Sequence, residues 1–360
     1  MLLYLAAILD GRARSFFSPA HWSRFDSGIY LEIAAHGYSA TQCSNPALFP
    51  PHTMCGTVGW SPLYPGLIAM LGHLGLPLPV AAMALSILFA YLTLQMIWVL
   101  IGPSWSSSHL CCLALAACFP GMVYSYALFP VSLLTFLAVL CLILFIRRRF
   151  LLAGLVGALC TWAFALGPLI VVVLVVAAVL VERGPALWHC AARTAGVALA
   201  GFVAVLLLTQ WWVGNWTDYF KDQSKYGNGL HDPVTTFVMA FTGGPPAKYP
   251  LQDPNPGYNY LIPKAQTAFV AALVIGLIVW TVRRRPVSRA DWVLLSYTVV
   301  FWLAPLVDGP TLGRYRMEAL LVPCVALCTR LPRVLQVALV GVAAVLAVGL
   351  AQLFTQSLIW

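Results

Sequence analysis

The chain has 360 residues, of which 61% are hydrophobic and only 9% are charged, whereas a soluble globular domain carries about 25% charged residues. It contains a series of apolar stretches, several close to the ~20 residues that cross the hydrocarbon core of a bilayer. A soluble domain could not bury them all, so the composition excludes a soluble enzyme. The net charge of +9 does not indicate a nucleic-acid partner, because in a membrane protein the distribution of charge matters more than its sum.

In chain order, the apolar residues 1–9 are too short to span and are expected to form the outer half of a first helix. Residues 63–76 contain Pro65 and three glycines, which favours an interfacial helix. The region from Pro120 to Pro130 should contain a broken helix that lines a cavity or packs on protein. We predict an all-α polytopic membrane protein with about 10–11 transmembrane helices. The spans are expected at 80–101, 109–127, 130–146, 150–166, 168–181, 195–213, 265–282, 290–306, 319–330 and 334–354.

The basic residues define the orientation of this arrangement. One side of the predicted spans carries eleven arginines and two acidic residues, Glu182 and Asp291, whereas the other side carries nine basic and nine acidic residues. Because cytoplasmic loops carry an excess of Lys and Arg, the arginine-rich side is predicted to be cytoplasmic. Its arginines are Arg147, Arg148, Arg149, Arg183, Arg193, Arg283, Arg284, Arg285, Arg289, Arg330 and Arg333.

This orientation divides a single domain, residues 1–360, into outer loops and helical parts. The first outer loop covers residues 10–79 and is followed by a helical bundle at 80–213. A second outer loop covers 214–264, and the C-terminal helices cover 265–354, with a short outer loop at 307–318 between them. Loops as long as the first two are usually functional, so the working residues are expected there.

Two cysteines lie in the first outer loop, Cys43 and Cys55. The non-cytoplasmic side is oxidising, so these two are expected to form a disulfide, with two free thiols as the alternative. Most of the other cysteines fall in predicted spans, where a thiol behaves as a small apolar group.

Residues 21–38 of the first outer loop, HWSRFDSGIYLEIAAHGY, are the most informative stretch of the chain. Asp26 opens a short helix on which Tyr30 shares its face. A carboxylate at this position can serve as a general base, and it can equally be a helix N-cap that accepts hydrogen bonds from free backbone N–H groups. Glu32 is the best alternative base in the same stretch.

This stretch, together with Gly-Trp-Ser-Pro-Leu-Tyr-Pro at 59–65, resembles the GPI mannosyltransferase II family and its bacterial relatives, which belong to the GT-C class of membrane glycosyltransferases. The resemblance continues weakly at 119–120, 129–132, 223–233 and 313–315. The chain departs from the family pattern at three places: Phe25 replaces the usual Trp, Val131 replaces a Glu, and residues 165–167 lack an Arg. These departures affect the expected identity of the substrate more than the expected reaction class. The matching residues are Asp26, Tyr30, Leu31, Ile33, Ala34, Gly37, Tyr38, Pro62, Leu63, Tyr64 and Pro65.

The resemblance implies a GT-C-type fold and transfer of a sugar, typically mannose, from a polyprenyl-phosphate carrier. The acceptor would be a hydroxyl of a lipid-linked or glycan molecule on the non-cytoplasmic face, which in a bacterium is the periplasmic face of the inner membrane. Asp26 corresponds to the catalytic base of the family. With one base and a single displacement, the anomeric configuration would invert.

The leaving phosphate needs cations, and three arginines in the outer loops are candidates. Arg314 and Arg316 flank Tyr315 in the short loop, and Arg24 precedes Asp26. Arginine suits a phosphate because it binds two oxygens at once. For Arg316 a pair with Glu318 or contact with a lipid headgroup is an equal alternative. The remaining substrate-binding candidates are Tyr30, Tyr64, Gln223, His231 and Tyr315, of which Gln223 and His231 are more readily explained as structural.

No cofactor is predicted, because the first outer loop contains no paired acidic motif of the kind that binds a metal. A lipid or glycan flippase without transferase activity is the main alternative function, although its spans should carry more polar residues than these do. A structural partner of another membrane enzyme is a third possibility. Such a partner would not require the carboxylate of Asp26 for its function.

Overall fold

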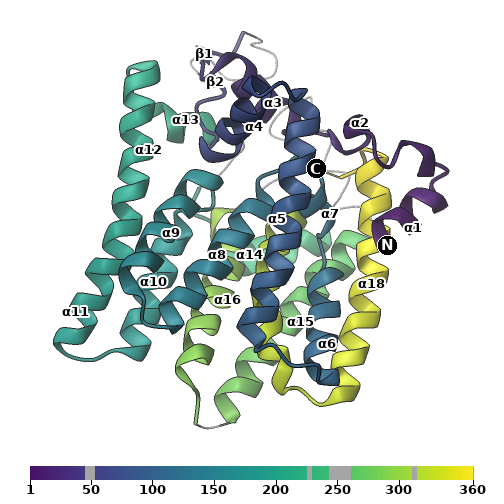
Figure 1. Cartoon of the computed structure of the whole chain (residues 1–360), viewed down its shortest axis with the longest axis vertical. Helices are drawn as coiled ribbons and strands as arrows, with labels where there is room; N and C mark the ends of the chain where they lie inside the picture. Colours follow the sequence, from purple (N-terminus) through teal and green to yellow (C-terminus); the bar gives the residue numbers. More distant parts are fainter. Residues whose placement is uncertain (45–52, 225–228, 243–260, 285, 310–313, 360) are drawn as a thin grey trace.

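The structure, a computed structural model, describes residues 1–44, 53–224, 229–242, 261–284, 286–309 and 314–359. Five long helices in it are apolar enough to cross a membrane and lie side by side (Figure 1). Their length and composition make the chain an integral membrane protein, as predicted. They are α5 (Leu78–Ile101), the continuous helix Pro185–Val213, α15 (Leu261–Arg283), α16 (Arg289–Asp308) and α18 (Arg333–Thr355).

Shorter apolar helices fill the bundle between the long ones. Helix α8 is buried on nearly all sides, because it packs against α5, α9 and α16. The predicted spans agree with the observed helices to within about four residues, apart from the exceptions below, but α14 lies in the stretch that the sequence assigned to the second outer loop. The shorter helices are α6 (Ser107–Ala117), α8 (Val131–Ile146), α9 (Phe150–Ala163), α10 (Leu169–Val181) and α14 (Pro233–Thr242).

Three predicted spans differ from the structure. The span expected at 195–213 begins ten residues earlier, because α11 (Pro185–Ala191) runs through a single π-helical turn at 192–196 into α12 (Val197–Val213). The span expected at 319–330 is a 3-10 helix whose residues 319–328 are all buried. A 3-10 helix rises about 2 Å per residue, so these twelve residues reach further than an α-helix of the same length.

The third difference is a break in the span expected at 109–127. Helix α6 ends at Ala117, and the four-residue α7 (Val123–Tyr126) follows after a turn. Gly121 in this turn has φ +81°, and a Cβ atom there would lie 2.8 Å from the carbonyl oxygen of Tyr315. The turn therefore lets α17 (Arg314–Glu318) approach closely, in agreement with the prediction that the Pro120 region packs on protein.

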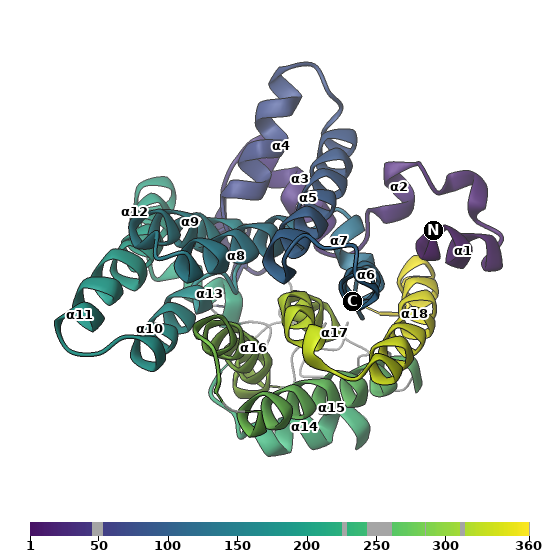
Figure 2. The ribbon, with the colours of Figure 1, turned by 60° about the horizontal axis from the view of Figure 1, so that its bottom comes forward.

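The 3-10 helix that continues α17 contacts α5, α6, α8, α15 and α16. In Figure 2 it lies inside a ring of these helices. The elements of the first outer loop gather at the opposite end from the turns near Arg147 and Arg283 (Figure 1). They are a 3-10 turn at Ala13–Ser15, α2 (Pro19–Trp22), α3 (Ser27–His36), β1 (Ala40–Gln42), β2 (Met54–Gly56) and α4 (Leu63–His73). Helix α1 (Leu2–Leu9) precedes this loop and packs against α18.

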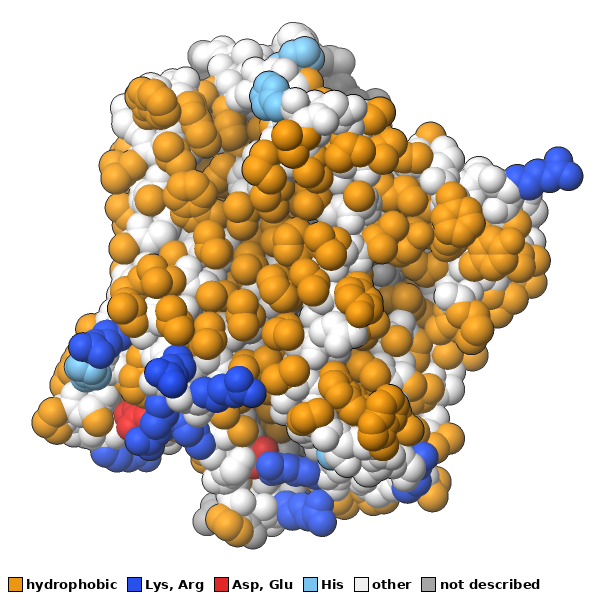
Figure 3. All heavy atoms as spheres, in the orientation of Figure 1, with side chains coloured by type: hydrophobic (Ala, Val, Ile, Leu, Met, Phe, Trp, Pro, Cys, Tyr) orange, Lys and Arg blue, Asp and Glu red, His pale blue; other side chains and the backbone are white. Residues whose placement is uncertain are grey.

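The surface carries an apolar belt and a basic end (Figure 3). Lys and Arg side chains gather at the lower end of this view, below the belt. Two ion pairs brace it, Glu182 with Arg289 and Asp291 with Arg330. This distribution agrees with the predicted orientation, in which α3 and α17 lie toward the non-cytoplasmic side.

Candidate active site

Asp26 lies at the N-terminal end of α3, but its carboxylate does not cap the helix. The residue before it, Phe25, has φ 51°, a backbone conformation that non-glycine residues seldom adopt. The backbone N–H of Arg24 donates to Ser27 Oγ at 3.2 Å, which closes this turn. Among the described residues the Asp26 side chain makes no capping hydrogen bond. The N-cap expectation is therefore wrong, and strain at such a turn is typical of functional sites.

The carboxylate of Asp26 pairs with Arg316 instead. Arg316 Nη1 donates to Asp26 Oδ2 at 2.6 Å, across 290 positions of sequence. The Asp26 side chain is 20% exposed and that of Arg316 is 13% exposed. The expected alternative pair of Arg316 with Glu318 does not form, because Glu318 accepts hydrogen bonds from Gln266 and Thr267. The ion pair is thus shielded by protein and still open to a ligand through Asp26.

Aromatic rings surround the guanidinium of Arg316. Its carbon lies 5.4 Å from the centre of the Phe129 ring, a distance at which a cation is attracted to the ring face. Burial alone lowers the pKa of Arg316, but the charge of Asp26 and the hydroxyl of Tyr30 outweigh burial and raise it above the usual value. Arg316 Nε is buried and has no hydrogen-bond partner among the described residues. Arg316 is therefore a fixed cation with a buried donor, Nε, that no described residue satisfies.

Tyr30 and Tyr64 form the wall beside this pair. Their rings meet edge to face at 5.4 Å, and the Tyr64 hydroxyl is hydrogen-bonded to Ser86 Oγ at 2.8 Å and to the Ala82 carbonyl at 3.1 Å. Burial raises the pKa of Tyr30 well above its usual value, and the negative charge of Asp26 raises it further. Both tyrosines, which the sequence suggested as substrate-binding residues, are buried, and a tyrosine held neutral in this way does not act as a base.

The other predicted arginines lie apart from this pair or outside the described atoms. The guanidinium of Arg24 donates to the carbonyl oxygens of Ala20 and Ser23 at 2.8 Å and 3.0 Å. Burial lowers the pKa of Arg24, and the nearby charge of Arg12 lowers it further. Arg314 is the first residue of α17, and its side chain is not among the described atoms.

Tyr315 is buried, and its ring lies stacked against that of Tyr124, 6.3 Å between centres. Its carbonyl accepts a hydrogen bond from Gln266 Nε2 at 3.0 Å. The same amide nitrogen donates to Glu318 at 2.9 Å. Gln266 therefore fixes α17 against α15, and Tyr315 helps to hold Arg316 in place from within the core.

Gln223 and His231 have structural contacts, the role that the sequence favoured. Gln223 Nε2 donates to the Gly59 carbonyl at 2.7 Å, and the neighbouring Asp222 accepts from the Gly59 N–H at 3.0 Å. These bonds dock α13 (Asp218–Ser224) of the second outer loop onto the first. The backbone N–H of His231 donates to the Val307 carbonyl at 2.8 Å.

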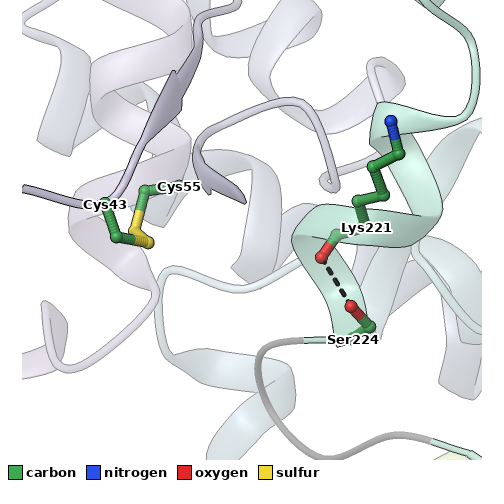
Figure 4. The surroundings of a disulfide bond; sticks show 4 residues. All are labelled: Cys43, Cys55, Lys221 and Ser224. Atoms are coloured by element: carbon green, nitrogen blue, oxygen red, sulfur yellow. Dashed lines mark hydrogen bonds between the residues drawn. A yellow bond between two sulfur atoms is a disulfide. The ribbon is translucent and has the colours of Figure 1, made fainter. Parts of the chain in front are cut away.

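A disulfide joins Cys43 and Cys55 at the β1–β2 hairpin (Figure 4). The strands pair antiparallel with Thr41 opposite Cys55. Strand β2 contacts α13, and the view in Figure 4 places the disulfide close to Lys221 and Ser224 of that helix. The hairpin therefore lies where the two long outer loops meet.

Sequence reasoning did not identify Phe129, Tyr124, Asp222 or Gln266 as supports of the site. Phe129 belongs to one of the weakly matching family segments, which was the only signal for it. Gln266, fully buried in α15, is a polar residue in an apolar stretch, a pattern that indicates a specific partner. Within the described ranges, no group of three His, Cys, Asp or Glu residues is arranged to hold a metal ion. The arrangement offers one carboxylate, one opposed cation and aromatic walls.

No family model matches the chain, and no curated protein matches it. Among solved structures, the crystal structure of ArnT from Cupriavidus metallidurans bound to undecaprenyl phosphate is similar, with a TM-score of 0.55 and 15% sequence identity. The match covers 91% of this chain and 58% of ArnT, so the chain spans less than two thirds of that protein. The chain therefore has the fold of a GT-C membrane glycosyltransferase, as predicted.

Proposed function

We propose that this integral membrane protein is an inverting glycosyltransferase that takes a sugar from a polyprenyl-phosphate donor. The acceptor is a hydroxyl of a lipid-linked or glycan molecule on the non-cytoplasmic face. The observation that carries the proposal is the shielded ion pair between Asp26 and Arg316, 2.6 Å apart, at the predicted outer side. The fold shared with ArnT, which was crystallised with undecaprenyl phosphate, supports a polyprenyl-linked substrate.

In this proposal Asp26 is the general base. The acceptor hydroxyl must lose its proton as its oxygen bonds to the anomeric carbon, and a positioned carboxylate accepts it, typically with a rate gain of about 10²–10⁴-fold. The bond between the anomeric carbon and the phosphate oxygen breaks, and both electrons leave with the phosphate. Asp26 suits this role because its side chain keeps 20% exposure toward incoming ligands.

Arg316 contacts both negatively charged groups of the proposed reaction, the carboxylate of Asp26 and the phosphate of the donor. Through Nη1 it holds the carboxylate of Asp26, and its buried Nε lacks a partner among described residues. A phosphate oxygen of the donor would satisfy this donor, and negative charge develops on that group as the sugar leaves. Arg314 is proposed as a second cation for the phosphate. No metal ion is required, because these cations supply the positive charge.

We take the proposed sugar and the proposed side of the membrane from the family resemblance. Mannose is the usual sugar of the GPI mannosyltransferase II-like family, and in its bacterial relatives transfer takes place at the periplasmic face of the inner membrane. The basic end of the molecule supports this location, because it would lie in the cytoplasm on the side opposite to α3.

The test is Asp26→Asn in the purified protein, supplied with polyprenyl-phosphate mannose and a lipid-linked acceptor. The variant keeps the shape of the side chain but cannot accept the proton, so transfer should fall by about 10²-fold or more. Glu32→Gln is the matched control, because Glu32 is an exposed carboxylate on the same helix. Full transfer activity of Asp26→Asn would reject the catalytic assignment of Asp26, whereas a wild-type protein that transfers no sugar would favour a flippase or a structural partner.

A further inference from the structure

Three basic side chains gather at the start of the first outer loop and have no role in the proposed reaction. Arg12 precedes α2, His21 belongs to it, and Arg24 follows it. The Ser15 hydroxyl donates to the Arg12 carbonyl at 2.9 Å and is hydrogen-bonded to His21 Nδ1 at 3.1 Å. The guanidinium of Arg24 returns to α2, where its Nη1 donates to the Ala20 carbonyl at 2.8 Å. We call Arg12, His21 and Arg24 the basic cluster.

The positive charges of the basic cluster act on one another. Burial lowers the pKa of His21, and the charges of Arg24 and Arg12 lower it further, although Asp10 opposes them. Burial also lowers the pKa of Arg24, and the charge of Arg12 adds to this effect. The three side chains are therefore held near one another although their charges repel.

No carboxylate neutralises the two arginines. Within the described ranges, neither Arg12 nor Arg24 takes part in an ion pair. Arg12 donates to the Thr355 carbonyl, which offers a dipole but no charge. The carboxylate of Asp10 accepts from Thr355 Oγ1 at 2.8 Å and from Gln356 Nε2 at 3.1 Å. An anion placed between the two guanidinium groups would be attracted by both.

Two buried nitrogens of the basic cluster lack a hydrogen-bond partner in the part of the chain that the structure describes, Arg24 Nε and His21 Nε2. His21 is only 5% exposed, and a buried polar atom without a partner indicates a missing ligand or water. Ser15 gives its single hydroxyl hydrogen to Arg12, so the neutral imidazole of His21 donates from Nδ1 and keeps Nε2 as an acceptor. The basic cluster thus offers donors to an anion and one acceptor to a hydroxyl.

The surface around the basic cluster is apolar, which indicates where the ligand comes from. Helix α1 exposes Ile8 to 50% and Leu9 to 61%, and Phe17, which lies between Arg12 and His21 in sequence, is 74% exposed. Apolar side chains cover this region at the right of Figure 3, where Figure 1 places α1 and α2. A lipid of the outer leaflet can contact these side chains while its headgroup reaches the cations, whereas inorganic phosphate would gain nothing from them.

We propose that the basic cluster binds the headgroup of an anionic phospholipid of the outer leaflet. The phosphate lies between Arg12 and Arg24, and a headgroup hydroxyl donates to His21. The uncompensated charge of two arginines favours phosphatidylglycerol, which has a net negative charge and a glycerol hydroxyl, over a zwitterionic lipid. The backbone N–H of Arg24 donates to Ser27 Oγ at 3.2 Å, so a bound headgroup also braces the turn that carries Asp26.

The experiment maps the contact by photolabelling. Phosphatidylglycerol with a diazirine in its headgroup, added to the full-length protein in detergent, should label peptides within residues 10–27. Arg24→Gln should reduce this labelling by about ten-fold, the usual effect of losing one charged hydrogen-bond partner. Arg14→Gln is the matched control, because Arg14 is an exposed arginine of the same loop, and its labelling should equal that of the wild type.

Three results would overturn the proposal. The first is unchanged labelling of Arg24→Gln, and the second is equal labelling of the wild type by phosphatidylcholine with the same diazirine. Arg24→Lys keeps the positive charge and should retain part of the labelling. A loss in Arg24→Lys as complete as in Arg24→Gln is the third, because it would mean that Arg24 supports the loop and not a ligand.

Thermal unfolding separates a lipid headgroup from a free anion. Phosphatidylglycerol should raise the unfolding midpoint of the wild type more than that of Arg24→Gln, and inorganic phosphate at the same concentration should raise neither. Equal stabilisation of the wild type by inorganic phosphate would show that the ligand is a soluble anion, and the lipid assignment would be wrong. Asp26→Asn should be labelled like the wild type, so the outcome does not depend on the proposed reaction.

Discussion

Arg316 and Asp26 form an ion pair of 2.6 Å although 290 positions separate them in the chain. Each comes from a short helix at the predicted outer side, α17 and α3, and the centre of the Phe129 ring lies 5.4 Å from the guanidinium carbon. Because the partners are largely buried, removing one leaves the other with an uncompensated charge. This relationship makes Arg316 the most informative residue to change after Asp26.

Arg316→Ala should lower kcat by about 10²–10³-fold, the usual effect of removing one group that stabilises developing charge. Arg316→Lys keeps the charge and loses the paired donors, so it should recover part of the rate. Both are measured by transfer from a polyprenyl-phosphate sugar, with kcat and KM separated. Arg14→Ala, at an exposed arginine of the first outer loop, is the control and should stay near wild type. An unchanged kcat in Arg316→Ala would contradict the proposal that Arg316 stabilises the charge of the leaving phosphate.

Gly121→Val should displace α17 and destabilise the protein by about 1–3 kcal/mol. The backbone has φ +81°, and a Cβ atom would lie 2.8 Å from both the Tyr315 carbonyl and the Ala319 Cβ. The measurement is the thermal unfolding midpoint, together with transfer activity at a temperature where the variant is folded. Gly341→Val in α18, where nothing lies within 4 Å, is the comparison. Equal thermal unfolding midpoints for the two variants would show that the close approach of Gly121 to Tyr315 and Ala319 does not contribute to stability.

Replacing both Cys43 and Cys55 by Ser should destabilise the first outer loop by ~3 kcal/mol in the chain-entropy account of a short loop. The bridge closes a sequence separation of 12 residues and lies where β2 meets α13. Limited proteolysis of residues 39–60 should accelerate in the double variant. Reductant should do the same to the wild type and have no further effect on the variant. A reductant effect that persists in the variant would point to other thiols.

Protonation of His21 should destabilise the protein below neutral pH. Burial lowers the pKa of His21, and the charges of Arg24 and Arg12 lower it further, although Asp10 opposes them. The unfolded chain then binds a proton at a higher pH than the folded chain does. The stabilisation that comes from neutral His21 is therefore fully present above about pH 6.5, the pKa of the unfolded chain, and is lost as the pH falls through the pKa of His21 in the folded protein.

The measurement for His21 is the unfolding midpoint between pH 7.5 and 5.5, compared with His21→Asn. Asn cannot take up the proton, so the midpoint of the variant should fall less over this interval. Other titrating groups contribute equally to both proteins. An identical slope in the two proteins would mean that His21 titrates as in the unfolded chain.

The long apolar helices were predictable because each depends on its own composition. Helices α5, α15, α16 and α18 each hold enough apolar residues to cross the bilayer, whatever their neighbours are. The 3-10 segment Ala319–Arg330 and the break after Ala117 depend on packing. Both occur where Gly121 lets α17 approach. Pro120 did indicate a broken helix here, but the approach of a distant segment has no local signal in the sequence.

The candidate site was predictable in part. The Asp26 stretch attracted notice because its residues match a known family pattern. Tyr30 feels the charge of Asp26, and Tyr64 packs edge to face on Tyr30. The choice of Asp26 over Glu318 as the partner of Arg316 was not predictable. Glu318 lies only two residues away in sequence, and the structure shows that Gln266 and Thr267 already bind it. Proximity in the chain was therefore a poor guide to charge pairing.

The position of the ion pair has a consequence for how the protein is made. Because Asp26 enters the membrane early and Arg316 is translated late, a nascent chain that has inserted α5 to α15 still has no assembled pair. The same holds for Asp10 at the end of α1, which waits for Thr355 of α18 to donate a hydrogen bond at 2.8 Å. If the proposed function is right, the chain stays inactive during synthesis until α17 and α18 have joined the bundle.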